Sequence, residues 1–125
     1  MTEPEFLCRL VGLTGCCVLL DVHNLYANSL NLHFNAHSYI DSLPLDRVRE
    51  LHIAGGALVD DIYADTHARP ACKGVWELAE RIRSRALVYA IVLERDRDTF
   101  NSIDEIADEL RTASLIMNTS ISARQ

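Results

Sequence analysis

The sequence predicts an α/β fold in which parallel strands alternate with helices, arranged as part of a (β/α) barrel. Three short apolar runs, at residues 17–20, 47–53 and 87–93, are separated by stretches with helical periodicity. This alternation is typical of βαβ units and a parallel sheet. A closed barrel of this type has eight strands and about 250 residues, whereas this chain has 125 residues. We therefore expect a partial barrel of three or so βα units, folded as one domain over residues 1–125.

The first βα unit begins with a helix. Residues 4–13 place their apolar side chains on one helical stripe, and Gly15 supplies a C-terminal stop before the first strand. Residues 25–32 alternate poorly and are interrupted by asparagines, which predicts a long loop after that strand. A short helix is expected near residues 37–42, closed by Pro44.

The second unit has the clearest helix of the chain. Its strand leads into Gly55 and Gly56, which permit a tight turn and a close backbone approach. Residues 59–67 are rich in acids and predict a loop. Apolar residues then recur at helical spacing over residues 74–85, which predicts an amphipathic helix. Trp76, near its start, is interpreted as a packing residue between helix and barrel.

The third strand is followed by a predicted helix with a defined start. Ser102 and Glu105 have the spacing of a capping box, and apolar residues follow at helical positions. Residues 117–125 are polar and predict a frayed tail, so that about residues 4–115 are expected to be ordered.

Composition excludes several classes of protein. The net charge is −6, with 18 acidic against 12 basic residues, so we expect no nucleic-acid partner. The N-terminus lacks the pattern of a secretory signal, and no apolar stretch approaches the roughly 18 residues of a membrane helix. We therefore expect a cytoplasmic protein with no membrane partner. The cysteines lack metal-site spacing and are interpreted as small core residues in a reducing compartment: Cys8, Cys16, Cys17 and Cys72.

Each apolar run ends on a residue type that binds metal, namely Asp21, His52 and Glu94. In (β/α) barrels the chemistry lies at the carboxyl ends of the strands, so these side chains are expected to share one rim. Asp65 and His67 add two ligands on one side of a loop. A mixed set of imidazoles and carboxylates suits iron in oxygen chemistry or zinc in hydrolysis.

His23 and Asn24 follow Asp21 directly, and in an extended segment they face opposite ways, so that only one of them reaches the rim. Either residue remains open as a ligand. His33 and His37 lie farther along and are interpreted as solvated.

Each candidate also has a purely structural interpretation. Asp21 is a possible cap for the turn that follows its strand, and His52 a possible hydrogen-bonded core histidine. The sequence Asp65-Thr66-His67 is a common type of tripeptide. Residues 94–96 resemble a surface ion-pair cluster that contributes little to stability. The recurrence of such residues at strand ends favours the site.

Four blocks of sequence resemble the DUF692 (UPF0276) family, described as multinuclear non-haem iron-dependent oxidative enzymes. The blocks are Thr14–Asn28, Leu43–Val48 with Leu51–Gly56, Asp65–His67 with Val75–Leu78, and Leu93–Asp96. The resemblance covers residues 4 to about 110 and implies the C-terminal part of a TIM barrel. It further implies two or three iron ions, dioxygen as co-substrate, and a peptide-delivering partner protein. The implied reaction modifies cysteine residues of ribosomally synthesised precursor peptides.

Carried over by position, the resemblance implies a set of metal ligands: Asp21, His52, Asp65, His67 and Glu94, with Asn24 at the position of a further ligand. His23 stands where many members carry asparagine and is the alternative to Asn24. Because only the C-terminal part matches, an intact centre is expected to need a complementary N-terminal half or a homo-oligomer.

Three hypotheses about function follow. The first is the C-terminal portion of an iron-dependent oxidase of precursor peptides. The second is a non-catalytic truncated half-barrel that retains the family ligands and acts only by association through its exposed strand edges. The third is a divalent-metal barrel hydrolase or isomerase that activates water with zinc or manganese.

Overall fold

A computed structural model describes residues 1–120 of the chain. The elements in chain order are α1 (Glu3–Thr14), β1 (Val18–Asp21), α2 (Val22–Asn31), α3 (Ala36–Asp41), a 3₁₀ turn (Leu45–Arg47), β2 (Val48–Ile53), β3 (Ala57–Val59), β4 (Ile62–Ala64), α4 (Lys73–Arg83), β5 (Ala90–Leu93) and α5 (Ile103–Met117). The predicted polar tail begins where α5 ends, and its last residues, 121–125, lie outside the described residues.

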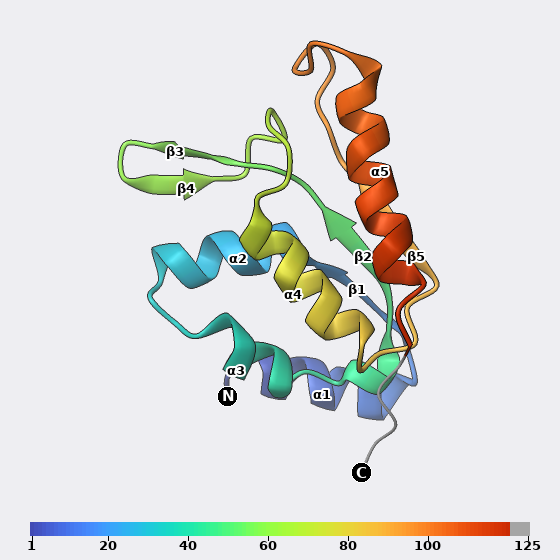
Figure 1. The fold of residues 1–125 in the computed structure, drawn as a ribbon. Coiled ribbons are helices and arrows are strands. Elements are labelled where there is room, and N and C mark those ends of the chain that lie inside the picture. The colour runs from blue at the N-terminus through green and yellow to red at the C-terminus, as the bar shows by residue number, and fades with distance from the viewer. Residues whose placement is uncertain (121–125) are drawn as a thin grey trace.

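The main sheet has three parallel strands in the order β1-β2-β5, with helices between them in the chain (Figure 1). This confirms the predicted α/β class, and the arrangement is consistent with a partial barrel. The register places Asp21 of β1 opposite His52 of β2, and His52 opposite Val92 of β5. The carboxyl ends of the three strands therefore lie side by side.

The two faces of this sheet differ in what covers them. Alternate residues such as Leu51 and Ile53 point into a core shared with the helices, where they are fully buried. The other face carries His52 together with Leu19 and Val92, which are 51 % and 37 % exposed. Both apolar side chains on this face are therefore partly open to solvent.

Helix α2 occupies the segment that was predicted to be a loop, so that prediction is wrong. Asp21 caps the helix, because its Oδ1 accepts a hydrogen bond from the Asn24 N–H at 2.8 Å. Asn24 and Asn28 lie on the exposed side of α2, while Leu25 is buried in the core. Tertiary packing thus outweighs the low helix propensity of asparagine.

The N-terminal caps of two helices differ from those that the sequence predicts. The first helix ends at Gly15 as predicted, with φ of 70°, and it starts with a capping box of Thr2 and Glu5 that was not predicted. At α5, Ser102 is the N-cap, but its hydroxyl accepts from the Asp104 N–H. The predicted capping box is therefore wrong, because the Glu105 carboxylate turns to Asn101 instead.

The predicted acidic loop after β2 contains a short antiparallel hairpin, β3 paired with β4. Its two turn residues, Asp60 and Asp61, have φ of 47° and 65°. Positive φ at both positions is the geometry of the type I′ turn that fits the twist of a hairpin. Sequence reasoning missed the hairpin because aspartate pairs signal this turn less clearly than Asn-Gly.

The interpretation of the cysteines as core residues is wrong for three of the four. Cys8, Cys16 and Cys17 are exposed and Cys72 is half-buried, all as free thiols. Cys16 and Cys17 precede β1, which begins only at Val18, so they have no place in the sheet. As for membranes, none of the helices in residues 1–120 combines the length and the apolar character that a bilayer span requires.

Candidate metal centre

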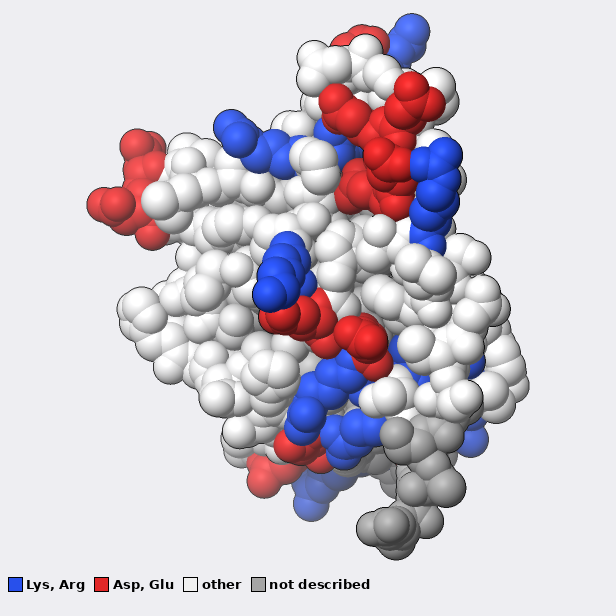
Figure 2. Space-filling model, in the orientation of Figure 1, with Lys and Arg blue, Asp and Glu red and all other residues white. Residues whose placement is uncertain are grey.

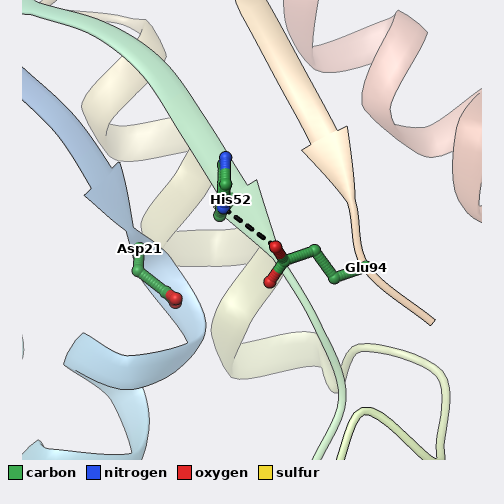
Figure 3. A group of neighbouring side chains, drawn as sticks. All are labelled: Asp21, His52 and Glu94. Carbon is green, nitrogen blue, oxygen red and sulfur yellow. Dashed lines mark ion pairs between the residues drawn. The ribbon is translucent and has the colours of Figure 1, made fainter. Parts of the chain in front are cut away.

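Asp21, His52 and Glu94 come together at the carboxyl ends of β1, β2 and β5 (Figure 3). One ligand atom from each lies within 4.8 Å of the others. The His52 Nδ1 is 3.1 Å from Glu94 Oε1. Parallel register produces this convergence, because the neighbouring strands end at the same edge of the sheet.

A second group continues from Glu94 into the loop after the hairpin. Glu94 Oε2 lies 3.6 Å from His67 Nε2, which in turn is 2.8 Å from Asp65 Oδ1. The same Asp65 oxygen is 3.3 Å from His23 Nε2. The candidates thus form one continuous cluster in which carboxylates and imidazoles alternate.

His23 and Asn24 both lie in the first turn of α2, so the argument from an extended segment does not apply to them. Asn24 is exposed, and its side-chain amide donates to Asp21 Oδ2 at 2.8 Å. His23 is fully buried: its Nε2 faces Asp65 at 3.3 Å without hydrogen-bond geometry, and its Nδ1 has no partner among the described residues. Each residue therefore reaches the cluster, Asn24 beside Asp21 and His23 beside Asp65.

Tyr63 stands beside His23, and Tyr26 stands beside Tyr63. The Tyr63 ring is tilted against the imidazole at a centroid distance of 5.7 Å, and Tyr26 meets Tyr63 edge-on. The Cys72 side chain, with burial as a further cause, raises the pKa of Tyr26 to about 12. The pKa of Tyr63 is raised as well, mainly by burial and next by the neighbouring Cys72. Both phenols therefore keep their protons at neutral pH.

Glu50 belongs to the cluster although sequence reasoning did not select it. Its Oε1 lies 3.0 Å from His52 Nε2, so each nitrogen of His52 faces a carboxylate. The sequence signal for Glu50 is its position two residues before His52, because residues i and i+2 of a strand point to the same face. A carboxylate that holds the second nitrogen of a histidine is a recurrent feature of metal sites.

Arg95 does not belong to a surface cluster with Glu94, so that alternative interpretation is wrong. The Arg95 side chain is only 5 % exposed, and its guanidinium pairs with Glu105 and Glu109 of α5, each at 3.1 Å. Glu109 also accepts from the Ala71 N–H at 2.7 Å. Arg95 follows Glu94 directly, and Ala71 lies in the segment that follows His67. Both loops are therefore bound to the buried carboxylate of Glu109.

The remaining histidines and the tryptophan stand apart from the cluster. His33 and His37 are exposed, as their interpretation as solvated residues expects. Trp76 is partly buried against the core, which agrees with a packing role.

The charges and donor types of the cluster fit a bound cation. Carboxylates as close as these repel one another unless positive charge is supplied. Over residues 1–120, no lysine or arginine forms an ion pair with any of the four cluster carboxylates, Asp21, Glu50, Asp65 and Glu94. Imidazole nitrogens and carboxylate oxygens are ligands for iron, zinc or manganese. The buried imidazole of His23 adds a further nitrogen ligand.

Gly56 gives the cluster its close packing against the hairpin. A Cβ there would lie 2.3 Å from the Ala64 carbonyl oxygen and 2.8 Å from His23 Cε1. We expect Gly56→Ala to lower the free energy of unfolding by about 2 kcal/mol or more, because backbone has to shift. Urea unfolding measures this. The matched control is Gly12→Ala in α1, where a Cβ meets nothing within 4 Å; equal stability changes in both variants would contradict the expectation.

Fold and cluster together define the class of this chain as part of a parallel (β/α) barrel with a candidate metal centre at its strand ends. A family model described as "RiPP precursor modification enzyme MbnB/TglH/ChrH" matches residues 1–118. The chain belongs to this family, which comprises modification enzymes for ribosomally synthesised and post-translationally modified peptides.

Curated relatives carry the name UPF0276 protein, in agreement with the resemblance found in the sequence. The chain is 39 % identical over 118 residues to the protein of Rhizorhabdus wittichii, covering 94 % of this chain and 42 % of the relative. It is 35 % identical over 113 residues to the protein of Caulobacter vibrioides, and the match covers 90 % of this chain and 40 % of the relative. The chain is 41 % identical over 99 residues to the Bordetella pertussis protein, and the match covers 75 % of this chain and 34 % of the relative. The chain thus spans about two fifths or less of these relatives' length.

Proposed function

We propose that this chain supplies part of a multinuclear non-haem iron centre, and that the complete centre uses dioxygen to modify cysteine residues of a precursor peptide. The convergence of Asp21, His52 and Glu94 within 4.8 Å carries the proposal. Membership of a family of RiPP precursor modification enzymes supports a peptide as substrate. Iron is one of the metals that a mixed set of imidazoles and carboxylates suits.

The cluster offers two neighbouring positions for metal ions. Asp21, His52 and Glu94 would hold the first ion, with Asn24 beside it. Asp65 and His67 would hold the second, with the buried His23 as a further ligand. Glu94 faces both positions through its two oxygens, which lie 3.1 Å from His52 and 3.6 Å from His67. His23 and Asn24 are then candidates for different ions rather than alternatives for one.

Bound iron would supply the electron transfer and dioxygen activation that these side chains cannot perform themselves. The chain's own residues provide orientation. The N-terminus of α2 and Asn24 fix the carboxylate of Asp21. With a metal ion held at its Nδ1, His52 would donate its Nε2 proton to Glu50, whose Oε1 lies 3.0 Å from that nitrogen.

Glu50→Gln tests this orienting role. We expect the affinity for Fe(II) to fall by roughly 10- to 100-fold, as for other carboxylates behind a metal-bound histidine. Anaerobic titration with Fe(II) measures the affinity. Glu77→Gln, a residue of α4 outside the cluster, makes the same chemical change, and its affinity should match the wild type. An unchanged affinity in Glu50→Gln would remove Glu50 from the centre.

Another polypeptide segment is proposed to complete the site. Leu19 and Val92 are exposed on the face that bears the ligands, and β1 and β5 each pair with only one strand within residues 1–120. A complementary N-terminal half, or a second copy of the chain, would cover this face and add ligands. A peptide-delivering partner protein is part of the same proposal.

The same exposed face favours a second candidate, a non-catalytic half-barrel that acts only by association. Metal analysis of protein purified anaerobically separates the two. The iron centre predicts iron near or above one equivalent and a change in visible absorption when a cysteine peptide is added. Little metal and no spectral change would favour the half-barrel. Zinc or manganese with activity independent of oxygen would indicate a hydrolase or isomerase instead.

A further inference from the structure

The two edges of the β3–β4 hairpin are not equivalent. At the β4 edge, the carboxamide of Asn31 forms two hydrogen bonds of 2.9 Å with Tyr63, accepting from its N–H and donating to its C=O. The Asn31 side chain therefore takes the place of a neighbouring strand. This edge of the hairpin is closed.

The β3 edge presents the corresponding groups without a cover. Leu58 lies opposite Tyr63 in the register. In an antiparallel pair, the hydrogen-bonding groups of alternate residues point away from the partner strand. Those of Tyr63 point outward to Asn31, so those of Leu58 point outward on the other side. In the part of the chain that the structure describes, no hydrogen bond beyond the hairpin engages the Leu58 N–H or C=O.

The side chains around this edge have the character of a binding surface. Leu58 is 69 % exposed, and its neighbours Val59 and Ile62 are exposed too. Asp60 and Asp61 form the turn, and the hairpin carries an acidic tip beyond uncharged sides (Figure 2). Within the described range 1–120, neither aspartate is paired with a lysine or arginine. Open edges with exposed apolar residues readily accept a further strand.

We propose that the open edge of β3 binds the precursor peptide as an added strand, with a basic residue of the peptide beside Asp60 and Asp61. Main-chain hydrogen bonds from Leu58 supply affinity, and the acidic tip supplies charge complementarity. The hairpin connects the two halves of the cluster, because β3 follows the segment after His52 and β4 runs directly into Asp65. The base of the hairpin therefore adjoins the candidate centre, where Gly56 packs against His23. This inference rests on the peptide substrate of the proposed function, but not on iron.

The test uses metal-free ¹⁵N-labelled protein of the full chain, so that failure of the metal centre does not affect it. The probe is an unstructured peptide of alternating threonine, valine and lysine residues. We expect peptide binding to slow hydrogen exchange at the Leu58 amide and to shift its NMR signal. The same peptide N-methylated at alternate residues cannot pair as a strand, and we expect it to bind roughly tenfold or more weakly. Equal binding of both peptides, or an unchanged Leu58 signal, overturns the proposal.

A double variant tests the acidic tip separately. Asp60→Asn with Asp61→Gly keeps the residue types that a type I′ turn prefers and removes both charges. We expect weaker peptide binding and a smaller dependence of affinity on salt. The matched control neutralises two exposed acids elsewhere, Asp98→Asn with Asp108→Asn, and should bind the peptide as the wild type does. An equal loss in both variants would show that net charge alone is responsible and would overturn the role of the tip.

Discussion

Replacing His52 by alanine is expected to lower the affinity of the chain for Fe(II) by more than about 100-fold. Loss of a carboxylate behind a metal-bound histidine typically costs roughly 10- to 100-fold, and loss of the ligand itself costs more. His52 is also the residue that stands between Asp21 and Glu94 at the strand ends. Without it, two carboxylates remain with no nitrogen donor at this position.

The measurement is an anaerobic titration with Fe(II), followed by metal analysis of the protein after desalting. His37→Ala is the control, because His37 is exposed on α3 and lies outside the cluster. It should bind iron as the wild type does. Wild-type affinity in His52→Ala would show that the three strand ends do not form the metal site, whatever the rest of the cluster binds.

Glu109→Ala is expected to destabilise the fold by about 3 kcal/mol, because it leaves a buried guanidinium partly uncompensated. Arg95 keeps Glu105, but the Ala71 N–H loses its acceptor as well. The loops that carry His67 and Glu94 should then separate more easily. Urea denaturation gives the free energy of unfolding.

Two variants bracket this effect. Glu109→Gln keeps an oxygen for the Ala71 N–H and loses only the charge, so its loss of stability should be smaller. Asp108→Ala removes an exposed acid of the same helix, paired with Arg111, and should change stability by only about 0.5 kcal/mol or less. A loss in Asp108→Ala as large as that in Glu109→Ala would contradict the role of the buried pair.

Local pattern was sufficient for the elements whose signal is periodic. The helix predicted over residues 74–85 is α4, because its apolar spacing matches the helical repeat. The strand predicted over residues 47–53 is β2, preceded by a 3₁₀ turn. The third strand starts later than predicted, at Ala90. Helix α2 was missed because its polar residues weaken the pattern while burial of one side stabilises the helix.

The sequence by itself determined which residues stand at the ends of the strands, and parallel pairing places all strand ends at one edge. For this reason the apolar runs alone indicate Asp21, His52 and Glu94 as a group. The tertiary structure alone decided the contacts made across the chain. Among these are the burial of His23 beside Asp65, the shared anchor of Arg95 and Ala71 on α5, and the closure of one hairpin edge by Asn31. Such contacts join residues far apart in sequence, so periodicity and local propensity carry no information about them.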